Sequence, residues 1–158
     1  MSNANKNGEV NFDRGVLGKE IDIGSHYVSE AELVSYAKSL GETNPIYIDP
    51  VFANSGPHRS IIATPGYYTA IPLKPSLDPN IEFTTNSFSY MAGQKVIYKN
   101  HIKAGDTLHA RSQVTNVYTK TGRSGALIFI ERKTTYLNQH NDTVLIVESS
   151  NVRADNKL

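Results

Sequence analysis

The second half of the chain consists of successive strand-like segments, and this pattern restricts the possible folds more than any other feature. Segments rich in Val, Ile, Thr and Tyr, or alternating in polarity, begin after Leu77. They cover residues 81–90, 95–103, 107–119, 125–137 and 143–153. Residues 104–106, 121–125 and 138–142 are rich in turn-forming residues and predict short connections. Such connections join neighbouring antiparallel strands, so the pattern predicts an antiparallel sheet.

The first half carries helix signals after an extended segment near residues 16–28. Ser29 and Glu32 form a capping-box pattern, which satisfies otherwise unpaired backbone N–H groups. Apolar residues then recur at spacings of three and four, and Gly41 can end this helix in a left-handed conformation. We expect a loop over residues 42–48 to follow.

Two further helices are predicted from a cap followed by proline. Asp49-Pro50 marks the start of one, and Thr64-Pro65 marks the start of the other. The last helix is limited to about two turns, or is kinked, by Pro72 and Pro75. Proline has this effect because it lacks the backbone N–H. The whole order predicts an α+β fold, with a helix packed on one face of a curved antiparallel sheet.

Length and composition indicate one ordinary globular domain. The chain has 158 residues, a formal net charge of +1 and no cysteine. These values predict no nucleic-acid partner and no disulfide, and they fit a reducing cytoplasm. No apolar run approaches the roughly 20 residues that span a bilayer, so we expect no membrane association. Residues 1–12 are polar at their start and predict a disordered tail, and residues 13–154 predict the domain.

The most informative stretch is residues 36–53, YAKSLGETNPIYIDPVFA. It resembles the signature of the MaoC-like (R)-specific enoyl-CoA hydratases. That signature has an aromatic residue, then Gly-Asp-x-Asn-Pro-apolar-His, then a small residue six positions later. The positions that agree in register are Tyr36, Gly41, Asn44, Pro45, Ile46 and Ala53.

The resemblance continues downstream. Residues 62–67, 92–98 and 104–108 are similar to three further family motifs: the start of the central helix, a His-Gly-Glu-Gln strand and a Pro-Gly-Asp-Thr-Leu turn. Together the matches cover most of residues 15–153, and they look most like the N-terminal dehydratase-like branch. The resemblance implies a single hot-dog domain, in which a curved antiparallel sheet wraps around a central helix. It also implies a dimer, either of identical chains or with another hot-dog subunit.

The family's chemistry implies roles for particular residues. In the family, the signature Asp and His add water across a trans-2-enoyl thioester of coenzyme A or acyl carrier protein, or remove it, and no cofactor beyond the thioester carrier is needed. Glu42 and Tyr47 stand at these two positions and are the candidate catalytic residues. The candidate substrate-binding residues are Asn44, with Gly66 and Tyr67 as backbone donors to the thioester carbonyl.

Both catalytic positions depart from the family pattern, so other roles stay open. Glu42 adds a methylene, and a displacement of about 1 Å can cost on the order of a hundredfold in rate. Tyr47 is a phenol with an ordinary pKa of about 10, so it is a poor base that can still donate a proton. Alternatively, Glu42 is a solvated loop carboxylate, Asn44 shapes the turn, and Tyr47 is a core or interface aromatic.

The remaining polar residues allow simpler interpretations. Asp106 is expected to fix a turn, and the five histidines lack metal-ligand spacing, so no metal site is expected. His58 lies either near the mouth of the site or in an exposed loop. Several cations could meet coenzyme A phosphates or simply be solvated: Lys95, Lys99, Lys103 and Arg111.

Three functions therefore remain open. The first is a hydratase or dehydratase (a lyase of fatty acid metabolism) in which Glu42 acts as base and Tyr47 as acid or hydrogen-bond donor. The second is a non-catalytic hot-dog subunit that shapes the acyl tunnel of a heteromeric hydratase. The third is an acyl-CoA thioesterase, which ranks lower because thioesterases of this fold do not carry the Gly-x-x-Asn-Pro signature. Whether the chain is itself an enzyme therefore depends on the two altered positions.

Overall fold

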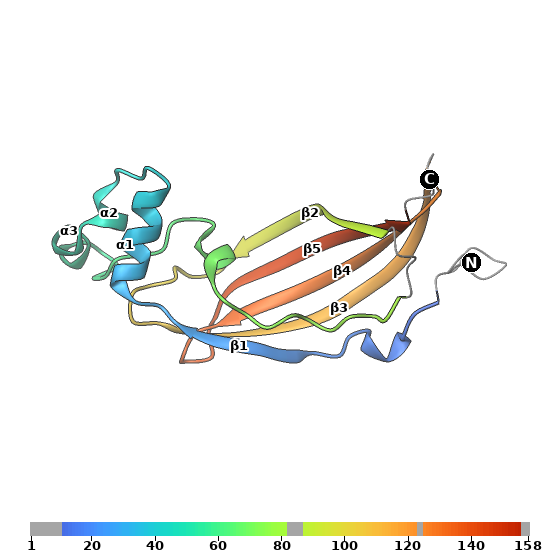
Figure 1. Cartoon of the computed structure of the whole chain (residues 1–158). Helices are drawn as coiled ribbons and strands as arrows, with labels where there is room; N and C mark the ends of the chain where they lie inside the picture. The colour runs from blue at the N-terminus through green and yellow to red at the C-terminus, as the bar shows by residue number, and fades with distance from the viewer. Residues whose placement is uncertain (1–10, 82–86, 123–124, 156–158) are drawn as a thin grey trace.

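A single curved antiparallel sheet dominates the computed structural model, which describes residues 11–81, 87–122 and 125–155 (Figure 1). Its strand order is β1-β3-β4-β5-β2, so β1 and β2 form the two edges. With a few short helices beside this sheet, the predicted α+β class is confirmed. The strands are β1 (Ile21–Tyr27), β2 (Ser87–Tyr98), β3 (Thr107–Gly122), β4 (Gly125–Leu137) and β5 (Thr143–Asp155).

The last three predicted strands are confirmed, and the first two are merged. The predicted break at residues 91–94 is a bulge inside β2, where the register against β5 shifts between Met91 and Gly93. Because β5 offers an unbroken partner, a bulge absorbs the extra residue without ending the pairing. Residues 82–86 of the first predicted strand and residues 123–124 of the first predicted turn lie outside the described part, as do residues 1–10 of the predicted tail. The turn at 138–142 closes through a hydrogen bond from Asn138 N to Asp142 O of 3.0 Å.

The first helix, α1 (Glu30–Ser39), begins where its cap predicts. The backbone N–H of Glu32 donates to Ser29 Oγ at 3.2 Å. Gly41 ends the helical region with a φ of 73°, the left-handed conformation that glycine adopts without a Cβ penalty. Leu33 and Ala37 are buried, so the predicted apolar face of this helix packs into the core.

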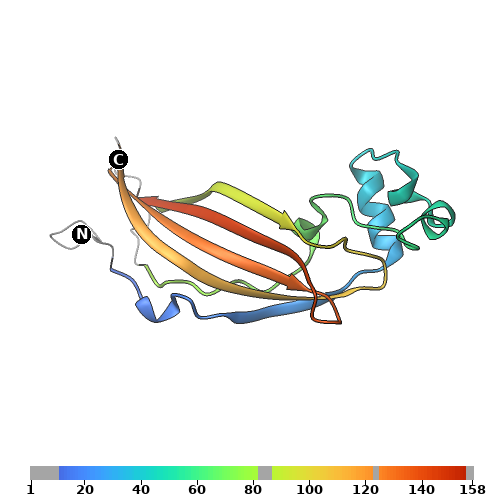
Figure 2. The ribbon, with the colours of Figure 1, turned by 180° about the vertical axis from the view of Figure 1, so that it is seen from behind.

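Two short helices follow, α2 (Pro45–Ile48) and α3 (Pro50–Ser55). The expectation of a loop over residues 42–48 is wrong for its second half, because Asn44 caps α2 and proline is tolerated at the first helical position. Asp49 caps α3 as predicted. These helices gather at one end of the sheet (Figures 1 and 2). No helix in the described part of the chain is long and apolar enough to cross a membrane.

The helix predicted to start at Thr64-Pro65 is wrong in kind and length. One 3₁₀ turn forms instead, η2 (Tyr67–Ala70), after Gly66 with a φ of 95°. Pro72 and Pro75 prevent its continuation, since each removes a backbone donor and disfavours helical geometry in the preceding residue. Residues 71–81 then run extended beside the sheet (Figures 1 and 2).

The core lies between the sheet and this returning segment. One cluster surrounds the buried Tyr67 of η2 and includes Leu108 and Leu145 from the sheet. A second cluster lies around Val114 and Ile130, and Phe12 packs against it. Tyr67 is only 1% exposed, so η2 is held firmly over the sheet.

Candidate functional site

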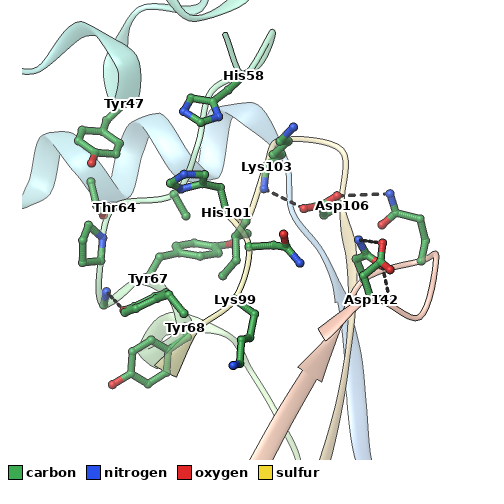
Figure 3. Close-up of a pocket in the computed structure, with 18 of the residues that line it drawn as sticks. Tyr47, His58, Thr64, Tyr67, Tyr68, Lys99, His101, Lys103, Asp106 and Asp142 are labelled. Carbon is green, nitrogen blue, oxygen red and sulfur yellow. Dashed lines mark hydrogen bonds between the residues drawn. The ribbon is translucent and has the colours of Figure 1, made fainter. Parts of the chain in front are cut away.

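A pocket of about 850 Å³ brings together segments that are far apart in the sequence. It opens where α2, η2 and the loops at one end of the sheet meet (Figure 3). Tyr47, residues 63–67 and Tyr98 belong to three of the motifs that suggested the family, so these motifs converge on one pocket. The lining consists of residues 63–68, 98–103 and 138–140, with Tyr47, His58, Asp106 and Asp142.

Three of the five predicted site residues line this pocket: Tyr47, Gly66 and Tyr67. Tyr47 comes from α2, is half-buried, and reaches toward Thr64 in Figure 3. The other two predicted residues, Glu42 and Asn44, are not among the described residues that line the pocket.

Glu42 and Asn44 hydrogen-bond their own turn. Oε1 of Glu42 accepts from the backbone N–H groups of Thr43 and Asn44, both at 2.9 Å. Oδ1 of Asn44 accepts from Ile46 N at 3.2 Å, and Tyr47 N donates to Asn44 O at 3.1 Å. In this arrangement, both side chains stabilise the turn that carries Tyr47 into the pocket.

The two predicted backbone donors already have partners within the chain. Gly66 N donates to the phenol oxygen of Tyr98 at 3.2 Å, and Tyr67 N donates to Thr64 O at 3.2 Å. The Tyr98 side chain lies at the end of β2 and is 49% exposed, so it can move into solvent. A carbonyl of any ligand therefore reaches Gly66 N–H only by displacing the Tyr98 hydroxyl.

Tyr67 is anchored by a polar network behind the pocket. Its hydroxyl lies 3.4 Å from His26 Nε2, and that nitrogen lies 3.0 Å from both carboxylate oxygens of Glu32. Burial, and then the Glu32 carboxylate, raise the pKa of Tyr67 far above its ordinary value, so this phenol stays protonated. The network joins β1, α1 and η2 and holds the pocket wall in place.

Further tyrosines lie on or near the pocket wall, and sequence reasoning assigned a site role to none of them. Tyr36 packs edge-to-face on Tyr67 with ring centroids 5.5 Å apart, and Tyr68 packs similarly on Tyr136 at 6.4 Å. Burial raises the pKa of Tyr68 and raises that of Tyr136 to about 12, so both remain neutral. Tyr36 is a position of the family signature, but for Tyr68 and Tyr136 the sequence offers only a high tyrosine content, 9 residues, which does not say where they gather.

Three histidines also line the pocket, His58, His101 and His140, and two of them contact each other. His58 and His101 contact edge-to-face with ring centroids 4.5 Å apart, and both line the pocket. His58, which the sequence left open between the mouth of the site and an exposed loop, lines this pocket, whereas His101 was not singled out. Burial, then the neighbouring His58 and Lys103, lower the pKa of His101. Its imidazole is therefore neutral at neutral pH.

Asp106 fixes the turn between β2 and β3, as the sequence predicted. Its Oδ2 accepts from Lys103 N at 2.8 Å, and its Oδ1 accepts from Gln139 Nε2 at 3.3 Å. The carboxylate thus joins two loops of the pocket wall. Within the described ranges, no three His, Asp or Glu side chains are grouped as a metal site would require.

Comparison with known proteins agrees with this arrangement. Residues 15–147 match the family described as "FAS1-like, dehydratase domain region". A curated "UPF0336 protein" of Streptomyces avermitilis is 25% identical over 116 residues, which cover 70% of this chain and 77% of that protein.

Solved structures share the fold. A MaoC-like dehydratase from Rhodospirillum rubrum superposes with a TM-score of 0.66 and 20% identity, covering 94% of this chain and 99% of that one. A chain of the HadBC (3R-hydroxyacyl-ACP dehydratase) complex of Mycobacterium tuberculosis also gives 0.66, with 12% identity, over 89% of this chain and 98% of that one. The predicted hot-dog fold is therefore confirmed.

Proposed function

Because the chain belongs to the FAS1-like dehydratase-region family, we propose that it is a hydratase or dehydratase of enoyl or 3-hydroxyacyl thioesters. The thioester carrier is coenzyme A or acyl carrier protein. The observation that supports this most is the convergence of Tyr47, residues 63–67 and Tyr98 on one pocket, since they come from three separate family motifs. A site for acyl thioesters requires such a cavity with a few polar groups.

The reaction needs a proton acceptor and a proton donor. In hydration, the water oxygen bonds to C3 of the enoyl group, one water proton passes to a base, and an acid supplies a proton to C2. Tyr47 is the proposed donor, because its phenol lies in the pocket. Glu42 is the proposed carboxylate base, which requires that its side chain exchange the backbone N–H groups of Thr43 and Asn44 for water.

A second candidate function is a non-catalytic subunit of a heteromeric hydratase. It is favoured by the same geometry of Glu42, whose carboxylate stabilises its own turn. It is also favoured by Gly66 N–H, which is already paired with the Tyr98 hydroxyl. Under this proposal the chain shapes the acyl tunnel while another hot-dog subunit supplies the reacting groups.

Either function is proposed to operate in a dimer formed through the edge strand β2. The strand exposes large apolar side chains, with Phe88 at 45%, Tyr90 at 46% and Met91 at 57% exposure. A free edge with such side chains can pair with another edge, which covers them and satisfies its backbone groups. The HadBC relative is itself described as a complex.

The deciding experiment is an assay of the purified full chain with trans-2-enoyl-CoA substrates of short and long acyl chains. The proposed enzyme consumes the conjugated enoyl group without releasing free thiol. Tyr47→Phe and Glu42→Gln should each reduce turnover by about 10²- to 10⁴-fold if they are the acid and base. Tyr27→Phe is the matched control, because Tyr27 is 62% exposed on β1. Absence of turnover with every chain length refutes the enzyme and favours the non-catalytic subunit.

A further inference from the structure

Three histidines that neither family position accounts for line the pocket, His58, His101 and His140, and the first two contact each other. His58 follows α3 and His101 follows β2, and their rings contact at 4.5 Å between centroids. Both line the same pocket as Tyr47 (Figure 3). Acid–base groups are therefore present in this pocket although the signature histidine is replaced by tyrosine.

The segment that carries His101 is held rigidly against the pocket wall. Ile62 and Lys103 form an antiparallel bridge, and Ala63 N donates to Ile102 O at 2.8 Å. Lys103 N also donates to Asp106 Oδ2 at 2.8 Å. Hydrogen bonds therefore fix the backbone on the C-terminal side of His101. A catalytic side chain needs such a rigid support, because it must meet the reacting atom in a defined position.

The His101 imidazole also has the chemical state of a base. It is exposed enough to meet water, and partial burial, then the neighbouring His58 and Lys103, lower its pKa and so favour its neutral form. Glu42, in contrast, accepts two backbone hydrogen bonds and does not line the pocket among the described residues. Of these two candidate bases, only His101 therefore faces the cavity as the structure stands.

We infer that His101 is a further catalytic residue of this pocket and acts as its general base, with Glu42 as a positioning residue for the turn that carries Tyr47. This rests on the proposed hydratase function and moves the role of base within it from Glu42 to His101. In hydration, His101 accepts one proton of water as the oxygen bonds to C3, and the electron pair of the double bond moves to C2. Tyr47 supplies the proton to C2. His101 then returns its proton to Tyr47 through solvent, so one water is added and nothing is oxidised.

The test compares histidine variants in the enoyl-CoA hydration assay. We expect His101→Ala to lower kcat by about 10²-fold or more with little change in KM, because a base acts in the transition state. Added imidazole should restore part of the activity, since the vacated position is open to solvent. His109→Ala is the control, because His109 is exposed on β3 and does not line the pocket among the described residues.

The possible outcomes separate this inference from the proposed function. A wild-type chain that hydrates enoyl-CoA, with His101→Ala equally active, overturns the role of His101 alone. A loss of activity that imidazole does not rescue, or a loss matched by His109→Ala, overturns it as well. If Glu42→Gln loses as much kcat as His101→Ala, Glu42 is not merely a positioning residue. A wild-type chain without any turnover overturns the proposed enzyme and the inference with it.

Discussion

Substitution of Asp106 by alanine should destabilise the protein because one buried carboxylate holds two loops. Asp106 is 9% exposed, and its oxygens accept hydrogen bonds from Lys103 N at 2.8 Å and Gln139 Nε2 at 3.3 Å. A hydrogen bond to a charged group contributes about 1.5–3 kcal/mol, and the longer bond contributes less. We therefore expect Asp106→Ala to lower the free energy of unfolding by about 2–4 kcal/mol.

Urea denaturation followed by circular dichroism measures this effect. With an m value of about 2 kcal/mol/M, the midpoint should fall by about 1–2 M. Asp106→Asn keeps an acceptor for Lys103 N and should lose about half as much. The control is Asp142→Ala, because Asp142 is exposed and accepts from Asn138 Nδ2 at 3.4 Å, a contact expected to contribute about 0.5 kcal/mol or less. The reasoning is refuted if Asp106→Ala changes stability no more than this control.

Two further predictions concern a surface ion pair and the free edge. Burial tends to raise the pKa of Asp78, but the hydrogen bonds from Arg153, at 2.7 Å, and from Asn80 N, together with the charges of Arg153 and Arg132, outweigh it, so the net pKa is lowered. The unfolded chain therefore binds more protons below about pH 4, so this contribution to stability is present above that pH and is lost as the pH falls. Asp78→Asn should lower the free energy of unfolding by about 0.5–1 kcal/mol at pH 7, a small loss because Asp78 is half exposed, and by less at pH 3. Equal decreases of the urea midpoint at both pH values would contradict this. Met91→Lys on β2 should weaken self-association at least about tenfold, as measured by sedimentation equilibrium. The control is Leu40→Lys at the end of α1, where Leu40 has a similar exposure of 59%, and it should leave self-association unchanged. Equal effects of the two substitutions would argue against pairing through β2.

Local chemistry was enough to predict most elements of the fold. Ser29 and Asp49 cap helices because a side-chain oxygen satisfies nearby backbone N–H groups, which depends only on neighbouring residues. The alternating segments after Leu77 became β3, β4 and β5, because alternation creates one face that must be buried. Family motifs in the sequence then identified the hot-dog fold that the comparisons confirm.

Local rules failed where neighbours in space decided the outcome. Thr64-Pro65 has the form of a helix start, yet the following residues make one 3₁₀ turn, which places Tyr67 in the core before Pro72. Residues 91–94 separate two predicted strands, yet β5 keeps this segment paired, and the irregularity becomes a bulge. In both places, burial or pairing with a remote strand outweighed a local preference.

The sequence by itself determined the α+β class, the order of strands along the chain, the family, and the two positions where its catalytic pair is altered. Only the tertiary structure decided which side chains share the pocket. Glu42 turns to its own backbone because unpaired N–H groups lie within reach, whereas Tyr47 enters the cavity. His58 and His101 meet because the sheet and its loops bring remote segments together, and spacing along the chain carries no record of such a contact.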